Sequence, residues 1–450
     1  EARTLLDRIF NQFDATSTIL KLEGKGKMIG KEVKWRQASL KVRTGVIAWD
    51  CEEPHNAETD LSEALDCYFP DLREKVDLMT PDEVELATSL EEDVADLLPM
   101  PLLQEKESVD AMKCLSMLGI LWAGRGNARR SFVYLYCCKD LFSQFKEAAS
   151  FSRPTMKMLE DSYTHNLFFL AQAYGNNGDA AKSSMYCHET LQRQLDAGIL
   201  GPAAIEWARS SFGLADFYMS MGYYNECALT LGAADFALGN LAKAKEDVNP
   251  SVFTKLDARD YSMLVSAETL EESQAELLQR WIRLDASNLA IASDAYKYTL
   301  AGLTSPLEEA TREKIDLPLS QQGFRGFEKS VALPPISSPI DIRCMEDAKE
   351  VFLRAAARIE KAKKYFLLDG FVTEHVALCR EHGKLYYSFS AFDPDPKRKL
   401  AMLSRRGTFL EPLLKSMNKV AYEVLHKEMS YEIGETYTTM LDIKIDQLKV

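Results

Sequence analysis

Apolar residues recur three and four positions apart through long stretches of the chain. This spacing places them on one face of an α-helix, and no convincing run shows the alternation that would indicate β-strands. Segments 272–300 and 346–366 keep the helical spacing without a Pro or Gly. Segment 303–342 instead carries several prolines and little periodicity, which predicts a long loop.

Three segments repeat one another without gaps: LGILWAGRG from Leu118, LAQAYGNNG from Leu170 and LADFYMSMG from Leu214. Each reads Leu, a small residue, two positions, a large aromatic, three positions and Gly. A further small residue follows nine positions after the aromatic, as Ser131, Ser183 or Cys227. Small residues let two helices approach closely, the aromatic fills the remaining gap, and Gly permits a tight turn. The repeat therefore predicts three helical hairpins.

These hairpins resemble the tetratricopeptide repeat (TPR), although their aromatics are 52 and 44 residues apart, which requires longer helices or loops. Ile433, Gly434 and Tyr437 resemble the start of a fourth hairpin. We predict an all-α, TPR-like fold. Its expected parts are an N-terminal helical array over 1–245, a linker helix and Pro-containing loop over 246–342, and an incomplete C-terminal helical array over 343–450.

The net charge of −14 argues against a nucleic-acid or anionic-membrane partner. Residues 76–105 concentrate this charge, since they hold many acidic residues and no Lys or Arg. Such a run is either a solvated loop or a region that attracts a basic protein. No apolar window is long enough for a membrane span. Nine cysteines, an odd number that lie mostly within apolar helical patterns, favour free thiols in the cytosol.

Enzyme motifs are largely missing: there is no Gly-rich phosphate loop, HExxH, GxSxG or paired CxxC. His375, Cys379 and His382 share one face of an expected helix and are the best metal candidates. Three ligands from a single helix would be an unusual zinc site, so we favour a packed helix face there. Cys187 and His188 are adjacent and point in different directions, so we expect no catalytic pair. We therefore expect no catalytic residue, metal, cofactor or small-molecule substrate.

The repeat register also predicts a binding surface. With Tyr174 as position 11, positions 2, 5 and 9, which line the concave surface of TPR-like arrays, are His165, Phe168 and Gln172. The equivalent residues of the next hairpin are Arg209, Phe212 and Asp216. Exposed aromatic anchors beside polar groups are typical of protein-binding surfaces. The alternative is that neighbouring segments cover one or both phenylalanines.

Several blocks resemble the kinesin-binding protein family: LGILW, YTHNLFFLAQAY, YCHETLQRQL, IEWA, FLLDGFVTEHV and RRGTFLEPLL. The last two have no TPR explanation. The resemblance implies a right-handed helical solenoid in two subdomains joined by a linker helix, truncated here at both ends. It also implies a cytoplasmic, cytoskeleton-associated protein that sequesters kinesin motor domains on its concave face and blocks their microtubule binding. Carried over to this sequence, the contact residues include Phe169, Gln172 and Gln194.

Three hypotheses stay open at this point. The first is a non-catalytic binder of kinesin motor domains, which an acidic chain would suit because a motor's microtubule-binding side must be basic. The second is a general TPR-type scaffold in a non-motor cytosolic complex. The third is an enzyme that uses a metal at His375, Cys379 and His382, which the missing motifs disfavour.

Overall fold

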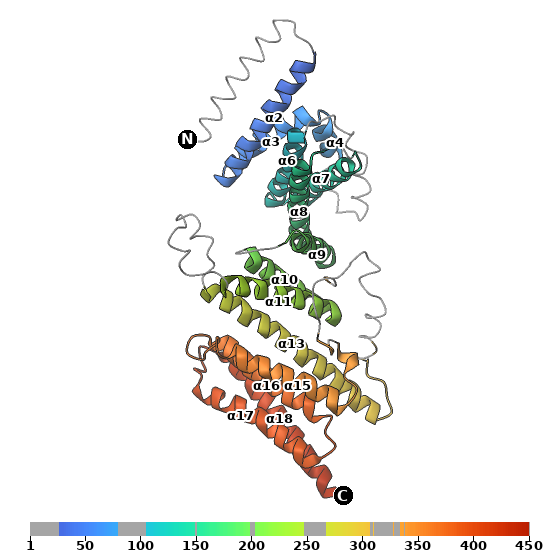
Figure 1. Ribbon diagram of the computed structural model, residues 1–450. Coiled ribbons are helices and arrows are strands. Elements are labelled where there is room, and N and C mark those ends of the chain that lie inside the picture. The colour runs from blue at the N-terminus through green and yellow to red at the C-terminus, as the bar shows by residue number, and fades with distance from the viewer. Residues whose placement is uncertain are drawn as a thin grey trace. The chain divides into compact units, whose positions relative to one another are not determined.

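The computed structural model describes residues 27–79, 105–148, 151–198, 203–246, 267–306, 309, 327, 334–336 and 338–449. Within these ranges the chain forms α-helices, turns and one short 3₁₀ helix, and none of these residues lies in a β-strand (Figure 1). The predicted all-α fold is confirmed. No helix within these ranges is long and apolar enough to cross a membrane. Most of the acidic run, residues 80–104, lies outside the described residues.

The chain divides into two compact units, Glu1–Gln194 and Leu195–Val450. The division into 1–245, 246–342 and 343–450 stays a prediction. The helices of the first unit are α2 (Lys27–Asp50), α3 (Pro54–Tyr68), α4 (Leu72–Met79), α6 (Glu105–Gly124), α7 (Ala128–Ala148), α8 (Arg153–Asn176) and most of α9 (Ala180–Asp196). One continuous apolar core joins them, and it includes the fully buried side chains of Leu118, Leu135 and Leu170.

The repeated residues form the hairpins α6–α7, α8–α9 and α10–α11, where α10 is Ala203–Met221 and α11 is Tyr224–Glu246. The turn glycines Gly126, Gly178 and Gly222 have φ of 78°, 82° and 80°, a backbone conformation that favours Gly. At Gly119 of α6 the neighbouring helix α7 lies close, because a Cβ built at Gly119 would lie 2.6 Å from the Leu135 side chain. The TPR-like pattern therefore predicts both the turns and the close helix pairs.

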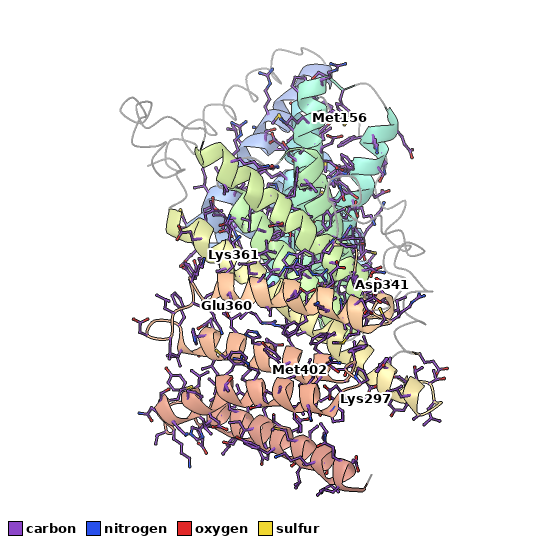
Figure 2. The ribbon with its side chains drawn as sticks, turned by 60° about the horizontal axis from the view of Figure 1, so that its bottom comes forward. Met156, Lys297, Asp341, Glu360, Lys361 and Met402 are labelled. Atoms are coloured by element: carbon purple, nitrogen blue, oxygen red, sulfur yellow. The ribbon has the colours of Figure 1, made fainter. Side chains whose placement is uncertain are left out.

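The second unit contains α10, α11, α13 (Ala267–Leu300), the 3₁₀ helix η3 (Pro339–Asp341), α15 (Met345–Ala362), α16 (Val372–Ser390), α17 (Pro396–Ser416) and α18 (Glu423–Lys449). The long helix α13 contains the segment 272–300 and packs on α10 and α11 as well as on α15 and α16. Its Ile282 and Leu289 lie in a core with Val351 and Ile359 of α15. Met402 of α17 packs against the same core (Figure 2).

A buried ion cluster also fixes α13. Asp285 is 1% exposed and accepts hydrogen bonds from Arg354 at 2.7 Å and from Arg358 at 2.5 Å. Burial lowers the pKa of Arg358, and the neighbouring Asp285 opposes this effect. Because a buried carboxylate without partners is costly, this cluster fixes how α13 pairs with α15.

The sequence also predicts a fourth hairpin that begins at Ile433, Gly434 and Tyr437. These residues lie inside the single helix α18, and the hairpin stays a prediction.

Candidate protein-binding surface

One exposed strip of α8 carries three of the predicted contact residues. Leu167, Leu170 and Tyr174 form the buried side of this helix. His165, Phe168 and Gln172 are exposed, at the spacing i, i+3 and i+7 that places them on one side of a helix. We call these three residues the α8 face. Phe168 is 41% exposed, so a large part of its apolar ring is accessible to a partner.

Phe169 and Gln194, the other two predicted contact residues of the first unit, differ in how exposed their side chains are. Phe169 is half-buried and packs against the core of the first unit. Its ring centroid lies 5.5 Å from that of Phe168 in an edge-to-face arrangement, so the half-buried Phe169 ring packs against the exposed Phe168 ring. Gln194 is exposed near the end of α9. Phe168 is therefore more accessible to a partner than Phe169 is.

The second predicted group lies on α10 and is largely occupied by α13. Phe212 is only 1% exposed, and the guanidinium of Arg280 lies 4.4 Å from its ring centroid. The prediction that Phe212 is exposed is wrong. The repeat register gives the correct side of α10, but α13 lies against that side. This is the covering that the sequence left open as an alternative.

Arg209 and Asp216 flank this buried ring and pair with α13. Arg209 lies 3.3 Å from Glu272, and Asp216 lies 3.3 Å from Arg280 and 3.6 Å from Arg283. The side chains of Arg209 and Asp216 are 39% and 37% exposed. Ion pairs as exposed as these contribute little to stability, so the same charges can also meet a partner.

The sequence profile of the family described as "KIF-1 binding protein C terminal" matches residues 205–450 of this chain. The chain belongs to the KIF-binding protein family. The resemblance seen in the sequence is therefore confirmed. The matched residues include most of α10 and all of α11, α13 and α15–α18, so the family match covers Arg209, Phe212 and Asp216.

Individual relatives agree with this assignment. A KIF-binding protein of Xenopus tropicalis is 27% identical over 359 residues, which are 73% of this chain and 56% of the relative. The Homo sapiens protein of that name is 27% identical over 361 residues, 73% of this chain and 56% of the relative. The Drosophila melanogaster protein is 24% identical over 316 residues, 69% of this chain and 50% of the relative. The chain thus spans about half the length of the curated relatives it matches.

A solved "circular tandem repeat protein with novel repeat topology and enhanced subunit contact surfaces" aligns with 99% of this chain and 92% of its own. The identity is 12% and the TM-score is 0.24. That score is below the level expected of two chains that share a fold. The assignment to the KIF-binding protein family therefore depends on the sequence matches.

The other polar residues beside the α8 face have structural roles in this family member. Asn166 is fully buried, donates a hydrogen bond to the Leu135 carbonyl at 2.9 Å and accepts one from the Ser116 hydroxyl at 3.1 Å. Tyr163 stacks on Phe142 with 4.2 Å between ring centroids. Sequence reasoning assigned Asn166 no role. Its place beside the buried Leu167 was the one available signal, because a polar residue on the apolar side of a helix must find partners.

The metal candidates of α16 are held by neighbouring groups. A ring nitrogen of His375 lies 2.8 Å from the Phe366 carbonyl. The His382 ring stacks on Phe409 at 4.4 Å, and burial, together with the charge of Lys363, lowers the His382 pKa to about 4. Burial likewise raises the pKa of the Cys379 thiol. Within the described ranges, no three His, Cys, Asp or Glu side chains are grouped closely enough to hold a metal ion.

The adjacent pair on α9 is also explained by packing. His188 is buried, and Cys187 is half-buried against the core of the first unit. Burial raises the pKa of the Cys187 thiol to about 11, so this thiol is protonated at neutral pH and is a weak nucleophile.

Proposed function

We propose that this chain binds kinesin motor domains and keeps them from binding microtubules. The observation that carries the proposal is the exposed Phe168 ring between His165 and Gln172, in a member of a family whose relatives are named KIF-binding protein. A chain of this kind would act in the cytoplasm, close to the cytoskeleton. It would need no metal, cofactor or substrate, because its effect is steric.

The α8 face offers two kinds of contact to a motor domain. The Phe168 ring would enter an apolar depression of the partner, since binding energy concentrates in a few well-packed aromatic anchors. His165 and Gln172 would orient the partner through hydrogen bonds. Phe169 supports the anchor from below, and Gln194 would extend the contact along α9.

Charge would guide the encounter. The chain carries a net charge of −14, and a surface that binds the acidic microtubule must be basic. Arg209 and Asp216 would contribute to the charge pattern that a partner meets on the second unit. Phe212 would act only indirectly in this proposal, by packing beneath Arg280. A motor held by its microtubule-binding side cannot bind the filament at the same time.

Microtubule co-sedimentation with a panel of purified kinesin motor domains tests this function. In the nucleotide state that binds tightly, a motor sediments with microtubules. Adding the chain in excess should move at least one motor to the supernatant in a concentration-dependent manner. If every motor stays in the pellet, the proposed function is wrong. A pull-down that enriches other proteins instead would favour the general scaffold.

Two Phe→Ala substitutions, one on the α8 face and one outside it, test whether this face is the contact surface. Phe168→Ala should weaken motor binding by about thirtyfold, because truncation of an interface anchor costs about 2 kcal/mol. Phe236→Ala on α11 is the matched control, since Phe236 is 43% exposed and lies outside the α8 face. If both substitutions weaken binding equally, the α8 face is not the contact surface. Phe169→Ala is less informative, because that ring also packs on the core.

A further inference from the structure

The block RRGTFLEPLL has no place in the helical repeat and no part in the proposed function. It begins with Arg405, Arg406, Gly407, Thr408 and Phe409. Arg405 and Arg406 thus lie three and two positions before the hydroxyl of Thr408, and the apolar ring of Phe409 follows Thr408 directly. Protein kinases select substrates by such charge patterns, and kinases with an acidic substrate groove select basic residues at these positions.

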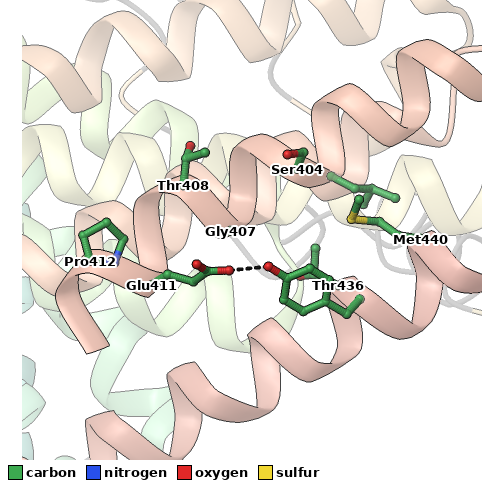
Figure 3. A pocket seen from close by; sticks show the side chains of 9 residues that line it. Ser404, Gly407, Thr408, Glu411, Pro412, Thr436 and Met440 are labelled. Carbon is green, nitrogen blue, oxygen red and sulfur yellow. Dashed lines mark hydrogen bonds between the residues drawn. The ribbon is translucent and has the colours of Figure 1, made fainter. Parts of the chain in front are cut away.

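Thr408 is accessible in the folded chain. Its side chain is exposed on α17 and lines a cavity of about 380 Å³ between α17 and α18 (Figure 3). The hydroxyl donates a hydrogen bond to the Arg405 carbonyl at 2.7 Å, and its lone pairs are left for a reaction. The chain's other pair of adjacent arginines, Arg129 and Arg130, directly precedes the fully buried Ser131.

The helix is weak at this turn. Pro412 lies inside α17, and because Pro has no backbone N–H, the Thr408 carbonyl cannot receive the usual helical hydrogen bond. Gly407 weakens the same turn further, by about 1 kcal/mol relative to Ala. Such a turn opens more readily than the rest of the helix. Opening is needed, because Arg406 is 3% exposed and pairs with Glu435 at 2.9 Å.

We propose that Thr408 is a phosphorylation site for protein kinases that select basic residues. In the transfer, the γ-phosphorus of ATP forms a bond to Oγ1 of Thr408 while its bond to the bridging oxygen breaks. ADP leaves with the electron pair of that bond, and the hydroxyl proton passes to a carboxylate of the kinase.

The phosphate would change the contact between α17 and α18. It adds a charge of about −1.5 to −2 at neutral pH. Glu411 lies three residues further along α17, and its carboxylate accepts a hydrogen bond from the Tyr437 hydroxyl of α18 (Figure 3). A phosphate on Thr408 repels the carboxylate of Glu411, which accepts the hydrogen bond from Tyr437. It therefore loosens α18 from α17.

Mass spectrometry of the intact chain, after incubation with MgATP and the catalytic subunit of cyclic-AMP-dependent protein kinase, tests the site. Phosphate is expected on Thr408, and Thr408→Ala should abolish this signal. Ser404→Ala should retain it, because Ser404 lines the same cavity but has Ala401 and Met402 where Thr408 has arginines. Arg405→Ala should slow modification by about tenfold, since a charge-assisted contact is lost. Absence of phosphate from Thr408 overturns the proposal.

Two further measurements test the opening of the helix and its consequence. Glu435→Gln should speed the modification, because it removes the nearer of the two carboxylates that pair with Arg406 and so weakens the hold on that side chain. An unchanged rate would contradict the opening step. Hydrogen exchange should be faster over 423–440 in the phosphorylated chain than in the unmodified one. Equal protection in the two forms would overturn the proposed loosening of α18.

Discussion

Asn166 shows how much of the first unit depends on one buried polar side chain. Its amide joins α8 to Leu135 of α7 and to Ser116 of α6. Asn166→Ala should destabilise the chain by about 1–3 kcal/mol, because the Leu135 carbonyl and the Ser116 hydroxyl then lose a buried partner. Urea denaturation followed by circular dichroism measures this loss. Asn176→Ala, at an exposed position of the same helix, should change stability by less than about 0.5 kcal/mol.

His382 gives the second unit a dependence on pH. Burial lowers its pKa to about 4 in the folded chain, against 6.5 when unfolded. Below pH 6.5 the unfolded chain therefore binds the proton more readily, and stability falls as the pH drops from about 6.5 towards 4. The full loss is about 3 kcal/mol. About 2 kcal/mol of this loss falls between pH 7.5 and pH 5, and urea midpoints at these two pH values measure that part.

Substitution of His382 separates this effect from general acid denaturation. His382→Phe keeps a ring against Phe409 and has no group that titrates, so the change in midpoint between the two pH values should shrink. Gln172→Ala, on the exposed α8 face, changes no titratable group and is the control. An equal pH response of His382→Phe and the parent chain would exclude His382 as its source.

At the residue scale, periodicity predicts which side of its helix a residue occupies. It places Leu170 and Tyr174 in the core and His165, Phe168 and Gln172 on the outside, as the structure has them. For Phe212 it predicts the right side of α10 and the wrong exposure. The reason is that α13, which covers that ring, follows it in the sequence by more than 50 residues. A local pattern contains no information about such a distant neighbour.

The close approach of two helices can be tested at the scale of one hairpin. Gly119→Ala would place a methyl group 2.6 Å from the Leu135 side chain. Overpacking of this kind costs about 1–3 kcal/mol, so the variant should unfold at lower urea concentration. Gly239→Ala is the matched control, because nothing lies within 4 Å of its added carbon. That variant should be neutral or more stable by up to about 1 kcal/mol. Equal effects of the two substitutions would mean that the contact between α6 and α7 does not require Gly at position 119.

At the element scale, the hairpins follow from local rules, and the role of α13 does not. Leu, a small residue, an aromatic and Gly are enough to predict α8–α9 and α10–α11, because turn and packing residues lie within one hairpin. The sequence also predicts a helix at 272–300. It cannot show that this helix becomes part of the second unit, because its Asp285 pairs with Arg354 and Arg358, about 70 residues away. Such pairs depend on the folded arrangement.

The properties of the whole molecule that could be predicted from sequence are those that sum over residues. Helix content and net charge are of this kind, and the first is confirmed by the structure. The boundary between the two compact units, after Gln194, is not a sum over residues and could not be predicted in this way. It falls within α9, a single helix that contains no Pro or Gly to mark a boundary. The predicted contact residues consequently belong to both units, with the α8 face and Gln194 in the first and Arg209 and Asp216 in the second.

If kinesin motor domains are the partners, net charge should determine how fast they bind. A chain of charge −14 attracts a basic motor surface over a distance set by screening, which is about 8 Å at physiological ionic strength. Raising the salt concentration should lower the association rate of the parent chain and leave the dissociation rate nearly constant. Stopped-flow or surface plasmon resonance measurements at several salt concentrations give both rates.

The Phe168→Ala variant should show the opposite pattern. It removes an apolar anchor and no charge, so its dissociation should be faster while the salt dependence of its association matches that of the parent chain. This comparison separates the long-range attraction, a property of the whole molecule, from the short-range contact at the α8 face. If Phe168→Ala instead changes the slope of association rate against salt, charge and anchor do not act independently, and the α8 face contributes to steering.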